Sequence, residues 1–551
     1  MEKMKSIVFL YAGFCTESVF DKVFDSKSSF DRALEWAASV DYCSKIVVFV
    51  SETTKKQAES AAAGLEKVTL EYLESWNVSQ LIKKMSALTE ENQCDFAVYS
   101  FADRPFLDNG LTSEIINTHL KYIAEYTTAD GYPSGFAPEV IDAGALKIMV
   151  SFAEGVKKEE GEKFVLPGSI FEIMKGDINS FDIEAVIAPK DWRLLRMEFS
   201  VSQKIKREAC IALYKTAKEK NIQFTADKLS YLAEETAEVQ KTLPAFYNIQ
   251  IARNCAIIDD FTPYAYQFKK KYGALPLKNG KGHGQLDMSL DDFSKIISQI
   301  VAFSESAVVS LSGWGEPLTV ENLADYVSIV LANPGLSVLI ETDGVLLTPQ
   351  IAESIANIAH IVPVRTDRGP SVSWIVKLDA ATEEKYARMH INTADFDDAE
   401  KSAFTKAKEA VSILNNLFPG DVYPQFIRVN ENEDELEQFY RFWHEKKSPS
   451  SGNLIIQKYD YFCGKQPDRK PADLSPLHRI PCWHLKRDMT ILADGNVPLC
   501  REYVLSYSVG NVLEEGLEAV WNKFNERFLK QLNNEYEDKC GACDEYYTFN
   551  F

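Results

Sequence analysis

The sequence predicts an α/β protein built from more than one domain, and three observations support this. Short apolar runs alternate with helix-period segments along most of the chain, a pattern that favours parallel sheets covered by helices. The length of 551 residues is enough for about two to four domains. Near the C-terminus the alternation gives way to a segment with four cysteines at metal-ligand spacing.

Changes in pattern divide the chain into four expected parts. Residues 1–200 are expected to form an α/β domain, and residues 201–245 a charged, helical and solvated linker. Residues 246–460 contain six strand–helix units, which predict a partial (β/α)6 barrel that is open on one side. Residues 461–551 carry the four cysteines and form a small C-terminal domain.

Composition excludes several classes of partner. The net charge of −21 is not offset by a basic stripe, so we expect neither a nucleic acid nor a membrane surface as a partner. The sequence contains no run of about eighteen apolar residues, so we expect no membrane-spanning helix. Ten cysteines in a chain of this length do not indicate a disulfide framework. We therefore expect a cytoplasmic protein.

The first domain is expected to contain strands at 7–10, 46–50 and 96–100. The third of these strands leads into Asp103, which Pro105 and Asp108 follow. An acidic residue at a strand end can hold Mg²⁺ against phosphates. Such a residue can equally begin a helix, and the residue types alone do not separate the two readings.

The segment from Asp103 to Asp108 resembles the D-x-P-x-x-D motif of the sugar-nucleotide cytidylyltransferases, and 133–140 resembles their P-x-G-x-x-x-E-V segment. The resemblance implies a Rossmann-like nucleotidyltransferase-type fold with a nucleotide-like site at Lys22 and Asp103. Most cations of the family's nucleotide loop are absent; Glu17, for example, stands where arginine or threonine is expected. A triphosphate needs several cations to offset its charge, so we expect the fold without nucleotidyl transfer.

The central part brings polar residues to the ends of its strands. The strands are expected at 247–251, 307–311, 337–340, 374–379, 425–429 and 454–457. The second strand leads into Gly313-Trp314-Gly315-Glu316-Pro317, and the third into Thr342-Asp343-Gly344. Functional groups of parallel barrels gather at these carboxyl ends.

These strand ends resemble the radical-SAM superfamily, with its Gly-Glu-Pro turn, its T-N-G and its S-L-D-A. The resemblance implies a vestigial S-adenosylmethionine site made by Gly313, Gly315, Glu316, Pro317, Thr342 and Asp379. The family's C-x3-C-x2-C, which binds a [4Fe–4S] cluster, corresponds here to Cys255, Asp259 and Thr262. One thiolate with a carboxylate and a hydroxyl is too poor in sulfur for a cubane. We therefore expect no reductive cleavage of S-adenosylmethionine.

The C-terminal part carries the strongest chemical signal. Cys482 precedes the turn pair Asp494-Gly495, which predicts a hairpin that Cys500 follows at once. A helix then leads to Cys540 and Cys543, so the four thiols are expected to converge. They can hold one [4Fe–4S] cluster or a tetrahedral zinc ion. Iron is favoured, because the first pair lacks the short C-x2–4-C spacing of structural zinc sites.

This segment resembles the SPASM/twitch extension that follows radical-SAM cores, and the chain as a whole resembles the family called spiro-SPASM. The twitch form implies one cluster, with Cys463 either an extra ligand or a packed thiol. Two functions stay open. One is a binding, scaffold or electron-transfer iron–sulfur protein; the other is an active radical-SAM enzyme that modifies a peptide or protein. Residual nucleotidyl transfer is a third.

Overall fold

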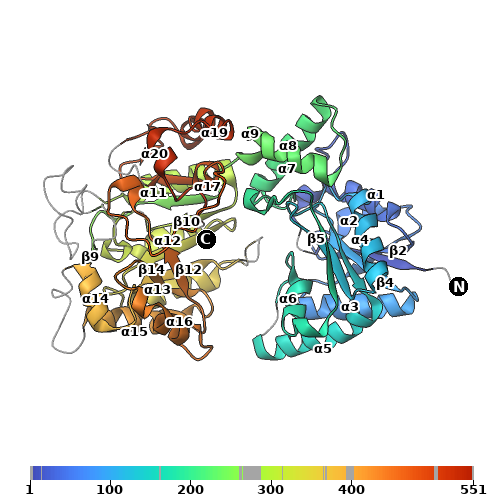
Figure 1. The fold of residues 1–551 in the computed structure, drawn as a ribbon, viewed down its shortest axis with the longest axis horizontal. Coiled ribbons are helices and arrows are strands. Elements are labelled where there is room, and N and C mark those ends of the chain that lie inside the picture. Colours follow the sequence, from blue (N-terminus) through green and yellow to red (C-terminus); the bar gives the residue numbers. More distant parts are fainter. Residues whose placement is uncertain are drawn as a thin grey trace. The chain divides into compact units, whose positions relative to one another are not determined.

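The computed structural model describes residues 4–548 except 14, 161–162, 260–263, 265–286, 313, 364, 366–368, 392–401 and 502–506. The chain forms two compact units, Met1–Thr242 and Leu243–Phe551. Figure 1 shows a sheet with covering helices in each of them. No helix in the described ranges is both long enough and apolar enough to cross a membrane.

The first unit contains a seven-stranded mixed sheet in the order β3-β2-β1-β4-β6-β5-β7. Its strands are β1 (Ser6–Tyr11), β2 (Cys43–Val50), β3 (Val68–Tyr72), β4 (Phe96–Phe101), β5 (Tyr126–Asp130), β6 (Glu139–Asp142) and β7 (Ile183–Ile187). Strand β1 shows why both faces are covered. Its side chains alternate, so that Val8 and Leu10 enter one core while Ile7 and Phe9 enter the other. The three strands expected in this domain are confirmed.

Helices cover both faces of this sheet. One face carries α1 (Ser29–Ser39), α2 (Lys55–Ala62), α4 (Asn109–Tyr122), α7 (Lys204–Glu219) and α8 (Ala226–Glu235). The other face carries α3 (Val78–Glu91), α5 (Ala143–Glu160) and α6 (Ser169–Lys175). This layered α/β arrangement agrees with the fold class expected from the sequence.

The segment 201–245 is not the solvated linker that the sequence suggested. Cys210 and Leu213 in α7, and Leu229 and Ala233 in α8, are buried in the core of the first unit. The expectation is wrong because the many charged residues hide an apolar stripe that recurs at helical spacing. The first compact unit therefore runs on to Thr242.

The second unit contains seven parallel strands in the order β15-β14-β12-β11-β10-β8-β16. Six of them are the strands expected for the half-barrel: β8 (Phe246–Ile249), β10 (Ala307–Ser310), β11 (Leu336–Thr342), β12 (Val372–Lys377), β14 (Val422–Arg428) and β15 (Ile455–Lys458). The helices between them include α11 (Leu290–Ser304), α12 (Leu323–Leu331), α13 (Pro349–Ile361), α15 (Ala403–Leu417) and α16 (Leu436–His444). The predicted partial barrel is confirmed (Figure 1).

The seventh strand of this sheet comes from the cysteine segment. Strand β16 (Asp488–Ile491) pairs with β8, whereas β17 (Asn496–Val497) pairs with β18 (Gly510–Asn511). The turn at Gly495 is present, and the Leu492 amide donates to the Asn496 carbonyl across it (2.8 Å), but among the described strands the two arms form no ladder with each other and pair with different strands. The free edge of β8 offers unpaired N–H and C=O groups, and β16 satisfies them. The domain boundary expected at residue 460 consequently lies inside one compact unit.

Candidate functional site

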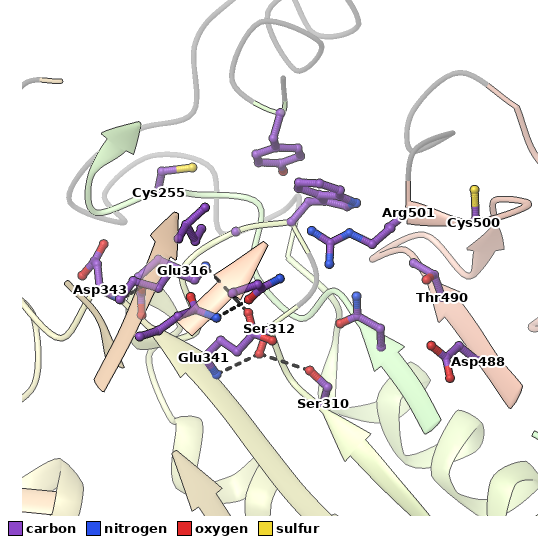
Figure 2. Close-up of a pocket in the computed structure, with 18 of the residues that line it drawn as sticks. Cys255, Ser310, Ser312, Glu316, Glu341, Asp343, Asp488, Thr490, Cys500 and Arg501 are labelled. Carbon is purple, nitrogen blue, oxygen red and sulfur yellow. Dashed lines mark hydrogen bonds and ion pairs between the residues drawn. The ribbon is translucent and has the colours of Figure 1, made fainter. Parts of the chain in front are cut away.

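A pocket of about 160 Å³ lies toward the carboxyl ends of the half-barrel strands (Figure 2). Acidic, basic and aromatic side chains share its wall. The lining residues include Cys255, Tyr264, Trp314, Gly315, Glu316, Glu341, Asp343, Lys377, Asp379, His390, His484, Asp488, Leu499, Cys500 and Arg501. The pocket therefore combines residues expected from the radical-SAM resemblance with residues of the cysteine segment.

Glu316 ties two strand-end turns together. One of its carboxylate oxygens accepts hydrogen bonds from the Leu318 amide (3.0 Å) and the Thr342 hydroxyl (2.6 Å). The other accepts one from the Asp343 amide at 3.0 Å. Burial raises the pKa of Glu316. The chain's own donors thus satisfy both oxygens of this predicted site residue.

Gly315 is needed because two loops approach each other closely. A Cβ atom at this position would lie 2.1 Å from the carbonyl oxygen of Ala252, in the loop that follows β8. The next amide, that of Glu316, donates to the Asn254 carbonyl at 2.7 Å. Pro317 begins the 3₁₀ turn Pro317–Thr319 and is buried. The Gly-Glu-Pro turn thus has a structural role in this chain; Gly313 lies outside the described residues.

Two further acids of the pocket are buried and bound by backbone amides. Asp343 accepts from the amides of Val345 (3.1 Å) and Ile257 (3.2 Å). Burial, together with the charge of Glu316, raises the pKa of Asp343 well above its usual value. Asp379 accepts from the Ile427 amide at 2.7 Å.

The backbone of Asp379 is left-handed, with φ 57°, and its second oxygen lies 3.6 Å from Nε2 of His390. The predicted Thr342, Glu316 and Asp379 therefore lie around one pocket or support its wall. Their described contacts are with the chain itself.

Cys255 contributes a thiol at the pocket, within a small aromatic cluster. It packs with Tyr264, Trp314 and Phe462, and the Trp314 ring centroid lies 6.0 Å from that of Tyr264 and 5.3 Å from that of Phe462. Figure 2 shows Cys255 on one side of the pocket and Cys500 with Arg501 on the other. The Arg501 guanidinium lies 5.7 Å from the centroids of the Trp314 and Phe462 rings.

The structure describes only in part the other two positions that align with the cluster-binding cysteines of the radical-SAM superfamily. Thr262 lies outside the described residues, and only the backbone of Asp259 is described, paired with His390. The sequence interpretation also missed the aromatic cluster and Arg501. The tryptophan inside the Gly-Glu-Pro turn and the arginine directly after Cys500 were the signals for them.

A second cavity gathers the cysteines of the C-terminal segment. It is lined by Cys463, Cys482, Cys500, Cys540 and Cys543, all of them half-buried. The four thiols predicted to converge thus share one cavity with a fifth. Three cationic side chains, those of Arg479, Arg527 and Lys539, also line it.

Arg479 clamps the C-x2-C loop. Its guanidinium donates to the carbonyl oxygens of Gly541 (3.1 Å) and Cys543 (3.0 Å), and also to that of Cys540. It also lies over the rings of Tyr536 and Tyr546, 4.6 and 4.3 Å from their centroids. The Arg479 side chain therefore adds to the loop's own backbone hydrogen bonds, such as the one from the Gly541 amide to the Glu537 carbonyl (2.7 Å). Sequence reasoning missed this arginine.

A buried ion-pair network docks the end of the chain on strand β15. Lys458 lies 3.1 Å from Asp544 and also contacts Glu545, and Lys470 contacts Asp544 as well. Asp460 brings a third carboxylate close to the other two. Because the two lysines pair with Asp544 and Glu545, and Arg501 lies 3.8 Å from Asp460, we interpret the cluster as an ion-pair network that fixes the residues after Cys543.

The nucleotide-like site of the first unit has little accessible chemistry. Asp103 is only 3% exposed, and burial raises its pKa. Lys206, from α7, pairs with Glu198 at 2.6 Å, and both act electrostatically on Asp103. Lys22 is exposed, and among the described residues no hydrogen bond or ion pair joins it to Asp103. Helix α7, expected in a solvated linker, instead closes over this region.

The cysteine cavity fits an iron–sulfur cluster on its donor set. Fe–S clusters require thiolates, and the cavity offers more than the four that one cubane needs. The three cations offset the negative charge that such a cluster would carry. Leu499, Cys500 and His484 line both this cavity and the half-barrel pocket, so the two sites share a wall.

Comparison with known proteins agrees with this geometry. Residues 482–544 match the model of the SPASM family, an iron–sulfur cluster-binding domain. An uncharacterized protein of Treponema pallidum (strain Nichols) is 38% identical over 387 residues, which is 69% of this chain and 98% of the relative. The chain belongs to that protein's family, and its tail is a SPASM domain. A second uncharacterized T. pallidum protein is 24% identical over 139 residues, 23% of this SPASM-domain protein and 63% of the relative.

Several solved structures are similar to parts of the SPASM-domain protein. A cytidylyltransferase from Leptospira borgpetersenii serovar Hardjo-bovis is 14% identical, covering 41% of this chain and 98% of its own, with a TM-score of 0.32. Streptococcus suis SuiB bound to precursor peptide SuiA is 11% identical, covering 73% and 84%, with a TM-score of 0.40. BtrN in complex with AdoMet and 2-DOIA is 16% identical, covering 55% and 94%, with a TM-score of 0.33.

Proposed function

We propose that this SPASM-domain protein binds one [4Fe–4S] cluster through Cys482, Cys500, Cys540 and Cys543, and that the cluster exchanges electrons with a ligand in the half-barrel pocket. The observation that carries the proposal is the wall shared by the two cavities, which includes Cys500 itself. A ligand in the pocket would be a direct neighbour of a cluster held by that thiolate. The role is therefore one of ligand binding and electron transfer.

Iron fits the cysteine cavity better than zinc does. Structural zinc sites are four-coordinate and usually built from short C-x2–4-C pairs, whereas only Cys540 and Cys543 form such a pair here. Iron–sulfur clusters accept thiolates that lie far apart in sequence. The SPASM match over 482–544 supports the same choice.

Anaerobic reconstitution tests the cluster. We expect about four irons and four sulfides per chain and the electron paramagnetic resonance signal of a reduced [4Fe–4S] cluster. Cys482→Ala and Cys500→Ala should each lower the iron content, because each removes a thiolate that the cluster needs. Cys43→Ala, which removes a half-buried thiol of β2 in the first unit, should leave it unchanged. Purified protein that holds zinc and no iron would contradict the proposal.

The half-barrel pocket is proposed to bind its ligand without cleaving S-adenosylmethionine. Cys255 supplies one thiol to the pocket, and the sequence offers a carboxylate and a hydroxyl at the two positions aligned with the family's other cluster cysteines. Under strong reductant we expect no 5′-deoxyadenosine above background in the reconstituted protein. Several turnovers of this product, lost in Cys255→Ala, would instead establish an enzyme.

An active radical-SAM enzyme is the second candidate, and the position of Cys255 favours it. The thiol lies in the pocket beside Trp314, whose turn matches the family's methionine-binding turn. The resemblance to SPASM enzymes makes a peptide or protein the proposed partner class. We assign no nucleotidyl transfer to the first unit, because Asp103 is buried.

A further inference from the structure

A fifth thiol reaches the cysteine cavity from outside the SPASM segment. Cys463 precedes residue 482, where the family match begins, yet it lines the same cavity as the four predicted ligands. One [4Fe–4S] cluster takes four cysteine ligands, so a fifth thiol in the cavity exceeds what the cluster needs. The position of Cys463 therefore calls for a function of its own.

The turn that carries Cys463 packs against the helix that carries Cys540. The turn is the 3₁₀ segment η7 (Phe462–Gly464), and the helix is α20 (Asp538–Ala542). The Tyr461 hydroxyl donates to the Ala542 carbonyl, which joins the two segments. Cys463 is also among the groups that act electrostatically on Cys540. The packing thus places Cys463 beside α20 and the Cys540 that this helix carries.

The backbone of η7 has an unusual conformation that holds Cys463 in this place. Phe462, Cys463 and Gly464 have φ angles of 54°, 51° and 82°, three left-handed residues in succession. Non-glycine residues rarely adopt such angles, so the surroundings must maintain them. Phe462 is anchored on the Trp314 ring, and the α20 contact holds the other side.

We infer that Cys463 is an exchange ligand, whose thiolate takes the place of the Cys540 thiolate on the cluster. In such an exchange a bond would form between iron and the Cys463 sulfur while the bond from iron to the Cys540 sulfur would break. The proton leaving Cys463 would be balanced by one taken up at Cys540, so neither net charge nor electron count would change. The inference rests on the proposed function and adds a second ligand set to the same site.

The exchange predicts an asymmetry among cysteine variants. After anaerobic reconstitution we expect Cys540→Ala to keep the iron and sulfide content of the wild type, with a shifted electron paramagnetic resonance spectrum because the ligand set differs. Cys463→Ala should keep the iron content too. The double variant C463A/C540A should lose at least half of the iron, as Cys482→Ala does, and Cys43→Ala is the matched control.

Thiol alkylation of the reconstituted protein, followed by mass spectrometry, provides a readout that does not depend on yield. In the wild type Cys463 should be the reactive thiol of the cavity, and in Cys540→Ala it should become protected. The inference is overturned if Cys540→Ala loses as much iron as the double variant, or if Cys463→Ala alone loses as much as Cys482→Ala. If the wild-type protein binds no iron at all, the proposed cluster itself is wrong. If the wild type binds iron but the variants behave as just described, only the exchange by Cys463 is wrong.

Discussion

Gly315 and Glu316 are the residues at which the second unit brings three strand-end loops into direct contact. The glycine lets the backbone of its turn touch the loop after β8, and the glutamate accepts hydrogen bonds from the turn after β11. Both residues belong to the turn that resembles a cofactor motif. Their contacts within the chain are sufficient to explain why these residue types stand here.

Gly315→Ala should destabilise the second unit. The added methyl would lie 2.1 Å from a backbone oxygen, so two loops must move apart, at a cost of about 1–3 kcal/mol of unfolding free energy. Gly155→Ala is the matched control, because a Cβ atom at Gly155, in helix α5, meets open space. Urea denaturation measures both, and equal midpoints would show that the close approach is not a constraint.

The buried pair of Asp343 and Glu316 should make stability depend on pH. The raised pKa of each acid in the fold means that the protonated form is favoured there. Their stabilising contribution is complete below the unfolded-state pKa, about 4, and is lost as pH rises through the raised folded-state pKa. The unfolding free energy of the wild type should therefore fall with pH across this window.

Asp343→Asn should reduce that slope, because residue 343 no longer titrates. Glu341→Gln is the control, since Glu341 lines the same pocket while its side chain is 27% exposed. Denaturation at a series of pH values provides the measurement. An Asp343→Asn slope identical to that of the wild type would refute the assignment.

At the level of elements, the C-x2-C helix α20 depends on a residue outside it. Arg479 donates to three carbonyls of the 540–543 loop, and its guanidinium lies over the rings of Tyr536 and Tyr546. This clamp joins the Arg479 side chain to backbone carbonyls and tyrosine rings, and it needs no bound cluster. It should therefore organise the loop in the metal-free protein as well.

Arg479→Gln should lower the unfolding free energy of the metal-free protein by about 2 kcal/mol or more, because hydrogen bonds from a charged donor are worth about 1.5–3 kcal/mol. Arg441→Gln is the control: its i,i+4 pair with Glu437 lies on an exposed helix face and is worth at most about 0.5 kcal/mol. Thermal and urea unfolding compare the two. If both variants matched the wild type, the clamp would not stabilise the loop.

The strands and the convergence of the cysteines could be predicted from the sequence, whereas the partners of several elements could not. Apolar periodicity is a local signal, so β1, β10 and β12 could be predicted from their own residues. The pairing of β16 with β8 joins segments far apart in the chain, and no local pattern encodes it. The same holds for Arg479, whose contacts arise only once α20 is placed, whereas for Cys463 the sequence leaves open whether it is an extra ligand or a packed thiol.

The whole molecule consists of two compact units, and the boundary between them follows α7 and α8 rather than preceding them. Both helices bury apolar residues in the first core, as Cys210 and Leu229 show. The charged residues on the other faces of these helices are the reason why the sequence predicted a linker here. The first unit is thus complete only with residues 201–242.

A fragment of residues 1–242 should unfold cooperatively as a monomer, and a fragment of residues 1–200 should aggregate. The shorter fragment lacks α7 and α8, which cover part of one face of the sheet, so it exposes a contiguous apolar surface. Circular dichroism melting and light scattering distinguish the two. Cooperative melting of fragment 1–200 at the temperature of the longer fragment would contradict this.

Strand β16 also limits how this protein can be recombined with its relatives. The SPASM tail looks like a detachable cassette in the sequence, but it supplies the strand that completes the half-barrel sheet beside β8. A chimera that replaced residues 461–551 with a foreign tail lacking such a strand would leave β8 as an edge strand with unpaired N–H and C=O groups. A working graft must therefore retain residues 488–491 or rebuild their pairing, so the cassette and its host have to be engineered as one piece.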